Sequence, residues 1–361
     1  MCQRLRFSGD STVVPGLRTC FSSKGSDGYA FQSKHALRTP ATALSSGIPV
    51  AMRGSSAPPF TEAGEEFSFE FFPPRSSAIS SMLRDTTARL RRFRPRFASV
   101  TYGAGGSTRD ATLATLLEIK ELSSWPVAGH LTCVGESRRS VNTAARTLWD
   151  SGVRHIVALR GDPPKGDGIY RPHPNGYRDA ADLVAGLKRI GDFEISVAAY
   201  PEGHPDAASP SRDLDSLKRK VDAGANRIIT QFCFHSDRIL RFVESVRAVG
   251  IEVPISVGIL PVGSFENMVR LSGRCGATVP EWMHRVFTSS GFESLDAAHI
   301  AESIALKQCI YLREKGLRCF HFYTLNRADL TAPVCRYLRI HARESSTPSP
   351  GPRMVCEVPE P

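Results

Sequence analysis

The chain lacks several features that would assign it to a common class. In its 361 residues there is no run of about 18 or more apolar residues, so we expect no membrane span. Its nine cysteines are scattered, with no Cys-x-x-Cys pair and no Cys/His cluster at zinc spacing, so we expect no metal site. Cys133 and Cys233 adjoin apolar runs and are predicted to be small buried hydrophobes, which favours a reducing compartment.

Two catalytic signatures are also missing. No Gly-x-Ser-x-Gly elbow is present, which argues against a serine hydrolase. The glycine-rich stretch at 102–108 is not a Gly-x-Gly-x-x-Gly after a first strand and lacks the lysine of a phosphate-binding P-loop.

A basic block is absent as well, although the net charge is +10. Seven Lys/Arg against two acidic residues fall within residues 1–60, and the rest of the excess is spread along the chain. A spread excess is typical of a solvated surface rather than a nucleic-acid footprint. A pocket for an anionic small molecule explains it equally well, so we expect neither nucleic acid nor membrane as a partner.

The composition, 41% hydrophobic and 23% charged, is that of a globular protein. Residues 1–62 show no sustained period and are rich in Ser, Thr, Gly and Pro, which predicts a disordered extension. The extension is either an organellar transit peptide or a misplaced start, with Met52 the true beginning. We therefore expect a cytoplasmic protein, or a mitochondrial one if residues 1–51 are a transit peptide. Residues 63–340 form the predicted domain, and 341–361 a second disordered tail.

Eight short β-branched or aromatic runs alternate with amphipathic stretches. The first seven begin roughly 30 residues apart, the length of one strand plus a crossover helix. Helical periodicity at 113–117, 214–221, 240–246 and 300–311 fills gaps between them, and an extra helix is predicted near 280–287. This pattern predicts a closed (β/α)8 TIM-type barrel, with an open doubly wound sheet as the alternative. The expected strands are 67–72, 97–102, 127–132, 155–160, 194–200, 227–232, 254–259 and 319–324.

Active sites of such barrels lie at the carboxyl ends of the strands. Polar residues gather at or just past those ends, which predicts one shared site. They are Glu70, Thr101, Tyr102, His130, Arg160, Gly161, Asp162, Tyr200, His204, Gln231, and Tyr323 to Arg327.

Glu70 is the most distinctive of them, because it is flanked by phenylalanines in Phe67-Ser68-Phe69-Glu70-Phe71. Alternation puts Ser68 and Glu70 on one face of a strand and the three phenylalanines on the other. Burial of a carboxylate raises its pKa, and an acid that keeps its proton near neutral pH can act as a general acid. The alternative is a structural Glu that pairs with a buried Arg or lies at the rim.

Other groups have two interpretations on local evidence. The glycine-rich turn can hold a phosphate or a flat ring, or be a plain loop. Arg160 suits a pyrophosphate and Asp162 a ring N–H, or the two simply pair and close their loop. Charges on a helix at Asp213, Arg219 and Lys220 are usually a solvated face.

Eight collinear motifs together resemble the methylenetetrahydrofolate reductase family in its short bacterial form. They cover about residues 65 to 335, the whole predicted barrel. The motifs are FSFEFFPPR (67–75), SVTYGAGGSTRD (99–110), HLTC (130–133), HIVALRGDPP (155–164), SVAAYPEGHP (196–205), LKRKVDAGANRIITQF (217–232), GILPV (258–262) and HFYTLNRA (321–328).

The resemblance implies an FAD-binding barrel that passes a hydride from NADH, or else NADPH, through the flavin to 5,10-methylenetetrahydrofolate. The product, 5-methyltetrahydrofolate, supplies the methyl group for methionine synthesis. The resemblance also implies that Glu70 is the general acid and that Asp162 tunes flavin and folate. Positions matched to FAD binding are Thr101, Tyr102, His130, Arg160, Gly161, Asp162, Tyr200, His204, Asp213, Arg219 and Lys220. Glu70, Gln231, Tyr323 and Arg327 match substrate-binding positions, and we expect a homo-oligomer.

Some positions depart from the family pattern: Asp179 stands at an expected Tyr, Ser216 at an Asn, Val257 at a Pro and Leu271 at a Phe. The chain ends soon after the barrel, so no S-adenosylmethionine regulation is expected. Two other hypotheses remain at this point. One is an FAD-binding barrel that oxidises an amino acid such as proline, and the other is a non-catalytic folate-binding module.

Overall fold

The computed structural model describes residues 65–103, 108–163, 170–261, 263–288 and 294–345. Several sequence predictions lie outside these ranges: the extension at 1–62, residues 104–107 of the glycine-rich turn, Pro164, Val262 and the end of the tail from 346 onward.

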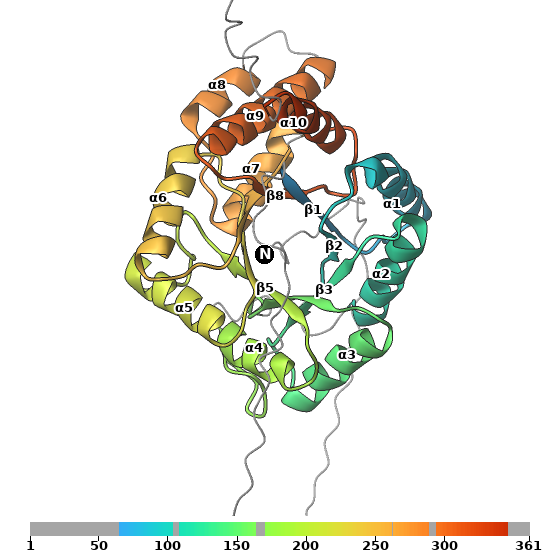
Figure 1. The fold of residues 1–361 in the computed structure, drawn as a ribbon, viewed down its shortest axis with the longest axis vertical. Coiled ribbons are helices and arrows are strands. Elements are labelled where there is room, and N and C mark those ends of the chain that lie inside the picture. The colour runs from blue at the N-terminus through green and yellow to red at the C-terminus, as the bar shows by residue number, and fades with distance from the viewer. Residues whose placement is uncertain (1–64, 104–107, 164–169, 262, 289–293, 346–361) are drawn as a thin grey trace, which may run out of the picture. The chain divides into compact units, whose positions relative to one another are not determined.

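Eight parallel strands form a closed barrel in sequence order, and β8 pairs with β1 to complete it. This arrangement confirms the predicted (β/α)8 barrel and rules out the open sheet (Figure 1). Each strand begins within one residue of its predicted start. The strands are β1 Glu66–Phe71, β2 Phe97–Val100, β3 Val127–Thr132, β4 His155–Leu159, β5 Glu194–Ala199, β6 Arg227–Thr230, β7 Ile255–Ile259 and β8 Cys319–Tyr323.

Helices surround the barrel and cover its outer face (Figure 1). The predicted extra helix is present as α8, and α10 runs five residues past the predicted end of the barrel domain at 340. The helices are α1 Ser77–Leu90, α2 Arg109–Ser123, α3 Arg138–Asp150, α4 Ala180–Lys188, α5 Pro210–Asp222, α6 Ser236–Ala248, α7 Phe265–Cys275, α8 Glu281–Thr288, α9 Ser294–Glu314 and α10 Thr331–Ser345, with a 3-10 turn η1 at Arg91–Phe93.

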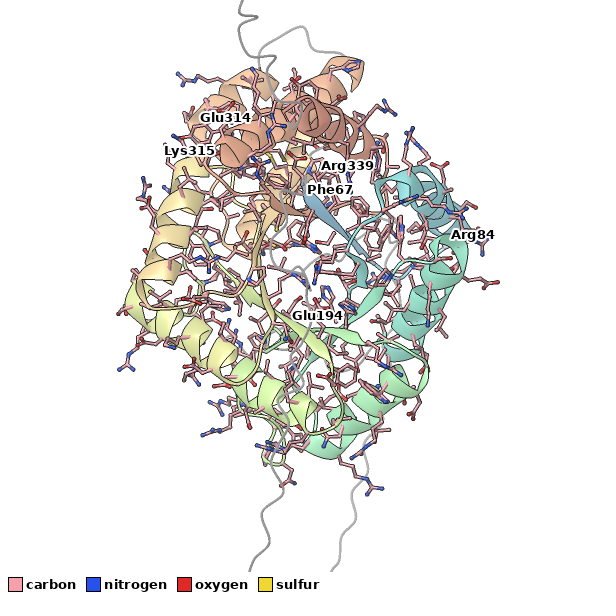
Figure 2. The ribbon with its side chains drawn as sticks, viewed as in Figure 1. Phe67, Arg84, Glu194, Glu314, Lys315 and Arg339 are labelled. Atoms are coloured by element: carbon pink, nitrogen blue, oxygen red, sulfur yellow. The ribbon has the colours of Figure 1, made fainter. Side chains whose placement is uncertain are left out.

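The alternation in β1 divides its side chains between two cores. Phe67 meets Phe93 edge-on at 6.5 Å, and the guanidinium of Arg339 lies 5.0 Å from the Phe67 ring (Figure 2). Phe69 packs on Trp125 in the same layer between strands and helices. Burial of each such ring contributes about 1.5–3 kcal/mol. This packing fixes the register of β1, so Ser68 and Glu70 face the barrel interior.

An ion pair with a buried arginine lies at the amino end of the barrel. Glu194 and Arg227 are the first residues of β5 and β6, and their side chains meet at 2.7 Å. Arg227 is 3% exposed and its guanidinium lies 5.3 Å from the ring of Phe97. The opposite end, where the strands terminate in loops, is where active sites of such barrels lie.

Two remaining expectations concern the cysteines and the membrane. Cys133 and Cys233 are buried and free, as predicted, and burial raises the pKa of the Cys133 thiol to about 11. Within the part of the chain that the structure describes, no helix has the length and apolarity to cross a bilayer.

Candidate active site

A cavity of about 480 Å³ opens where β4 and β5 end, against α4 and α5. Its size is within the usual range for ligand pockets. We call it the strand-end cavity. Among the predicted site residues it is lined by Arg160, Gly161, Asp162, Tyr200, His204, Asp213, Arg219 and Lys220. The structure therefore brings together eight residues from segments that lie up to about 60 positions apart.

Gly161 gives the β4 loop its shape. Its φ is +86°, a conformation that side chains disfavour, and a Cβ there would lie 2.4 Å from Cγ1 of Val134. Only glycine fits this turn without displacing the β3 loop. The tight turn puts Arg160 and Asp162 at the cavity wall.

The two predicted arginines of the cavity, Arg160 and Arg219, are paired with carboxylates that sequence reasoning did not assign to them. Arg160 donates to Asp206 at 2.7 Å, and its guanidinium lies 4.6 Å from the ring of Tyr170. Arg219 donates to Asp179 at 2.8 Å.

Asp179, the residue that departs from the family pattern, has a second role as the N-cap of α4. Its carboxylate accepts from the Asp182 N–H at 2.9 Å. Burial raises the pKa of Asp179, but hydrogen bonds from Arg219 and the backbone outweigh it and leave the pKa below its usual range.

The burial of Lys220 differs from what the sequence pattern predicts. Its position on α5 suggested a solvated face, but the side chain is buried and its Nζ donates to the carbonyl of Ala198 at 2.6 Å. Burial lowers the pKa of Lys220 to about 8, although Asp213 and Asp179 act in the opposite direction. A buried ammonium that donates to a neutral carbonyl is poorly compensated, which makes it a strong site for an anion.

Asp213 and His204 also line the strand-end cavity. Asp213 lies in the first turn of α5 and accepts from the backbone N–H of His204 at 3.0 Å. The rings of Tyr200 and His204 pack edge to face at 4.6 Å. Burial, and next the charge of Arg160, lower the pKa of His204. The wall therefore combines an aromatic surface with an imidazole that favours its neutral form.

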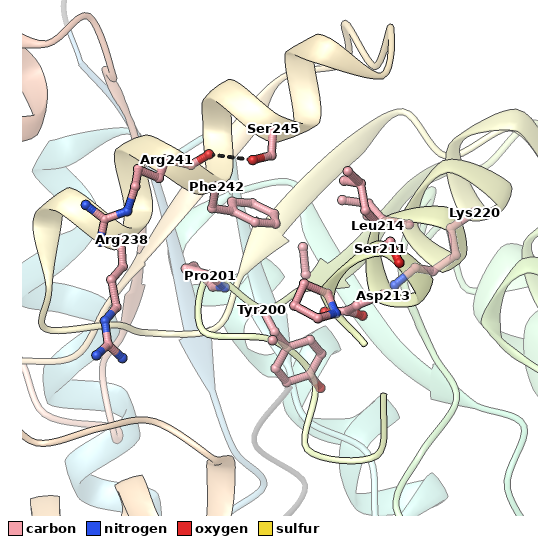
Figure 3. Close-up of a pocket in the computed structure, with 14 residues that line it drawn as sticks. Tyr200, Pro201, Ser211, Asp213, Leu214, Lys220, Arg238, Arg241, Phe242 and Ser245 are labelled. Carbon is pink, nitrogen blue, oxygen red and sulfur yellow. Dashed lines mark hydrogen bonds between the residues drawn. The ribbon is translucent and has the colours of Figure 1, made fainter. Parts of the chain in front are cut away.

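A second cavity, of about 320 Å³, lies on the far side of α5, against α6 (Figure 3). Tyr200, Asp213 and Lys220 line both cavities, so these side chains form a shared wall. The lining of the second cavity also includes Leu214 of α5 and, from α6, Arg238, Arg241, Phe242 and Ser245.

Glu70 lies near the carboxyl end of β1, 3% exposed, between two histidines of the barrel interior. Its Oε2 is 3.4 Å from Nε2 of His321 and 3.5 Å from Nε2 of His130. The partners are thus histidines, not the buried arginine of the alternative interpretation.

The expected rise in the pKa of Glu70 was wrong. Burial raises the pKa, as reasoned, but the charge of His130 and the hydrogen bond and charge of His321 outweigh it, so the pKa lies below its usual range. Burial in turn lowers the pKa of His130 to about 4. The ring nitrogens of His130 lack a hydrogen-bond partner within the described ranges.

Tyr323 is the last residue of β8, which neighbours β1, and Gln231 directly follows β6. The hydroxyl of Tyr323 donates to the Thr230 carbonyl at 2.8 Å and so reaches from β8 to β6 across β7. Gly258 of β7 makes this crossing possible, because a Cβ there would lie 2.2 Å from that carbonyl and 2.8 Å from the Tyr323 ring. Gln231 is buried and its N–H donates to Ala199 at 2.7 Å.

Three predicted residues, Arg327, Tyr102 and Thr101, are not among those that line the strand-end cavity. Arg327 is about half exposed and pairs with Asp329 at 2.6 Å. The hydroxyl of Tyr102 contacts Glu136 at 3.4 Å, and burial raises its pKa. The carbonyl of Thr101 accepts from Thr112 at 2.9 Å.

Sequence reasoning missed Ser68 and His321 as site residues. The available signal was alternation: His321 is two positions before Tyr323 on β8, as Ser68 is before Glu70 on β1. Of the remaining departures, Ser216 lines the strand-end cavity, and Val257 and Leu271 are buried in the core. Among the described residues, no group of three or more His, Cys, Asp or Glu side chains is arranged to hold a metal ion.

Comparison with known proteins gives a consistent result. A family model described as methylenetetrahydrofolate reductase matches residues 59–339. The 5,10-methylenetetrahydrofolate reductase of Pectobacterium carotovorum is 45% identical over 273 residues, which cover 76% of this chain and 90% of the relative. The Escherichia coli K12 protein of the same name is 44% identical with the same coverage.

More distant relatives share the barrel. The Arabidopsis thaliana methylenetetrahydrofolate reductase (NADH) 1 is 36% identical over 280 residues, or 74% of this chain and 47% of that protein. A solved structure of a Clostridium thermocellum protein, described as binding two copies of 5-methyl-5,6,7,8-tetrahydrofolic acid, has a TM-score of 0.56 at 14% identity. It covers 77% of this chain and 97% of that one, and shows the shared fold. The chain therefore belongs to the methylenetetrahydrofolate reductase family of oxidoreductases.

Proposed function

We propose that this chain reduces 5,10-methylenetetrahydrofolate to 5-methyltetrahydrofolate in an FAD-dependent reaction with NADH as the hydride donor. Family membership supports the reductase activity and a flavin. The observation that carries the proposal is the strand-end cavity, which contains the buried ammonium of Lys220 and lies at the same end of the barrel as a buried carboxylate, Glu70. The product would supply the methyl group for methionine synthesis.

The residues of the strand-end cavity fit FAD. The flavin carries a diphosphate, and Lys220 is a buried ammonium with a neutral carbonyl partner, so a phosphate oxygen would relieve its lost hydration. Arg160 and Arg219 would turn from Asp206 and Asp179 toward the phosphates, because guanidinium forks match phosphate geometry.

The remaining lining residues would orient the cofactor. Tyr200 and His204 offer an aromatic wall, and Gly161 lets the β4 loop pack closely on Val134. Asp162 would face the ring system and tune flavin and folate. When bound, FAD would supply the hydride chemistry between nicotinamide and folate. The protein supplies the position, the charge and the proton.

Glu70 would deliver that proton. Opening of the folate imidazolidine ring breaks a carbon–nitrogen bond, and the departing N10 takes the proton from the Glu70 carboxyl. The histidines favour the Glu70 carboxylate, whereas burial favours the protonated form that the reaction needs.

The folate and the nicotinamide would contact residues on the neighbouring strand ends. Gln231 offers an amide beside the end of β6, and Tyr323 lies opposite Glu70 in the β1–β8 register. Arg327 is accessible and pairs with an exposed Asp329, so a substrate carboxylate can replace that partner at low cost.

The test separates the two half-reactions. Glu70→Gln keeps the shape of the side chain but has no proton to give. We expect stopped-flow measurements to show near-normal flavin reduction by NADH and almost no reoxidation by methylenetetrahydrofolate. Equal losses in both halves would show that Glu70 is structural. A purified protein that is colourless and cannot be reconstituted with FAD would refute the proposed function as a whole.

A further inference from the structure

A buried carboxylate outside the strand-end cavity ties the loops after β2 and β3 to each other. Glu136 follows β3, directly before the N-cap Ser137 of α3, and is 7% exposed. Its Oε2 accepts from Nη2 of Arg109 and from Oγ of Ser140, both at 2.6 Å, and its Oε1 accepts from the Tyr102 hydroxyl at 3.4 Å. Nε of Arg109 also donates to that hydroxyl, at 3.2 Å. We call Tyr102, Arg109, Glu136 and Ser140 the Glu136 cluster.

The Glu136 cluster holds both ends of the glycine-rich stretch at 102–108. Tyr102 is the second residue after β2 and begins this stretch, and Arg109 follows it as the first residue of α2. A threonine contact joins the same two ends, because the Gly103 N–H donates to Oγ1 of Thr108 at 2.7 Å. The backbone that leaves β2 is therefore held to the start of α2, and the Glu136 cluster adds the loop after β3 to this connection.

The side chain and the backbone of Tyr102 have different surroundings. Its ring is buried in the layer between strands and helices, and its hydroxyl is engaged by Arg109 and Glu136. The N–H and the carbonyl of Tyr102, in contrast, have no hydrogen-bond partner among the described residues. Buried backbone groups of folded proteins are normally paired. These two groups are therefore available to a ligand at the carboxyl end of β2.

An ion pair of this kind fixes a geometry more than it adds stability. The attraction between Glu136 and Arg109 largely offsets the hydration that the two groups lose on burial, so their net contribution to folding is small. The hydrogen bonds are directional, however. The planar guanidinium donates through Nη2 to Glu136 and through Nε to Tyr102, which restricts how the three segments lie relative to one another. The Glu136 cluster thus specifies where the backbone of Tyr102 lies.

We propose that Glu136 and Arg109 are positioning residues for FAD, which act by holding the backbone of Tyr102 against the isoalloxazine ring. This inference rests on the proposed function, because FAD is the ligand only there. The topology assigns the ring rather than the diphosphate to this place. The cationic side chains that would take the phosphates line the strand-end cavity beside β4 and β5, whereas the Glu136 cluster lies after β2 and β3.

The first test is a fluorescence titration with FAD. Glu136→Gln keeps the shape of the side chain but removes its charge and one acceptor oxygen. The dissociation constant should rise about tenfold, the equivalent of about one hydrogen bond. Tyr102→Phe, the milder change, removes only the hydroxyl and should have a similar effect. Glu118→Gln is the matched control and should leave the affinity unchanged, because Glu118 lies on α2 in a surface pair with Arg84 at 2.6 Å.

Two double variants show whether the effect passes through Tyr102. Glu136→Gln with Tyr102→Phe should bind FAD no more weakly than the weaker single variant, because both substitutions break the same connection. Glu136→Gln with Lys220→Met should show the product of the two single effects, because Lys220 shares no hydrogen-bond partner with the Glu136 cluster.

The circular dichroism of the bound flavin at visible wavelengths adds a signature that general destabilisation would not give. The spectrum should change in Glu136→Gln and stay unchanged in Lys220→Met, since only the first alters the contact with the ring. The proposal is overturned by a product of effects in the double variant with Tyr102→Phe, by the absence of one in the double variant with Lys220→Met, or by an unchanged spectrum in Glu136→Gln.

Hydrogen exchange of the flavin-free protein, followed by NMR, separates this inference from the proposed function. The amides of Gly103 and Thr112 donate to Thr108 beside the Glu136 cluster. They should exchange faster in Glu136→Gln than in the wild type, and at the wild-type rate in Glu118→Gln. Equal exchange in all three proteins would show that Glu136 does not hold the loop after β2, whatever ligand the protein binds. If the wild type binds no FAD, the proposed function fails, and the exchange result still decides whether Glu136 holds this loop.

Discussion

Lys220 offers a sharp test, because its positive charge is unfavourable in the buried position that it occupies in the folded protein. Burial lowers the pKa of this ammonium from 10.5 to about 8. At neutral pH the folded protein therefore carries a charge at an unfavourable position. We predict that Lys220→Met stabilises the protein without flavin and weakens its binding of FAD.

The magnitude follows from two opposing contributions. A pKa shift of this size corresponds to a penalty of roughly 3 kcal/mol for the charged form. The substitution also removes the hydrogen bond from Nζ to the Ala198 carbonyl, which costs about 1–1.5 kcal/mol. Methionine has a similar length and fills the space. The expected net gain in the free energy of unfolding is about 1–2 kcal/mol at pH 7. The loss of a charged hydrogen bond to phosphate should weaken FAD binding about ten- to a hundredfold.

Urea unfolding of the flavin-free protein and a fluorescence titration with FAD measure the two effects. Lys218→Met is the matched control, because Lys218 lies on the same helix, is about half exposed and pairs with Asp222 at 2.9 Å. A surface pair of this kind contributes about 0–1 kcal/mol, so the control should change neither stability nor affinity greatly.

The pH dependence of the stability difference gives an independent check. Below pH 8 the lysine is protonated in both the folded and unfolded states, so the full penalty is present. Between pH 8 and 10.5 the unfolded chain binds more protons than the folded one, so stability rises with pH relative to Lys220→Met. The advantage of the variant should fade across that window. A variant less stable than the wild type at pH 7, or one that binds FAD equally well, would refute the reasoning.

Two further predictions concern the strand-end cavity. Asp179→Asn keeps the α4 cap but removes the carboxylate that holds Arg219, so FAD should bind about fivefold more tightly, or about 1 kcal/mol, with stability nearly unchanged. Asp222→Asn on α5 is its control in the same titration, and equal affinities in both variants would contradict the idea. Gly161→Ala should cost about 2–4 kcal/mol in urea unfolding, because its Cβ meets a valine at 2.4 Å in addition to the positive φ. Gly203 has a similar φ with open space around it, so Gly203→Ala should cost only about 1–2 kcal/mol. Equal losses of stability in the two variants would show that the structure relieves the contact between the new Cβ at 161 and Val134.

Regular periodicity made the barrel predictable. Alternation around Glu70 and the repeated strand–helix spacing placed every strand start within one residue. Strand ends were less accurate: β2 and β6 stop two residues before their predicted limits, at Val100 and Thr230. The residues beyond them, such as Tyr102 and Gln231, are suited to strands by composition but belong to loops. Propensity cannot show where a ladder partner ends, because the partner strand lies elsewhere in the sequence.

The charge states of the site were much harder to predict, because they depend on residues far away in the sequence. Local reasoning treated Lys220 as solvated, although the Ala198 carbonyl that receives its hydrogen bond lies on another element. The arginine partners Asp179 and Asp206 are also distant, 40 and 46 residues from the guanidinium that each of them binds. A sequence motif identifies such groups, but only the fold shows which charges are already neutralised.

Glu70 and Lys220 together show why burial alone does not decide an ionisation state. Burial opposes the charge of both groups, yet the pKa of Lys220 falls in the direction that burial dictates, whereas that of Glu70 moves against it. The difference lies in their partners: Lys220 donates to a neutral carbonyl, whereas the Glu70 carboxylate is stabilised by the charge of His130 and next by the hydrogen bond and charge of His321. On the proposals above, each imbalance has a use. The buried ammonium favours binding of the flavin phosphates, and the carboxylate, once protonated, is the acid that the folate half-reaction needs.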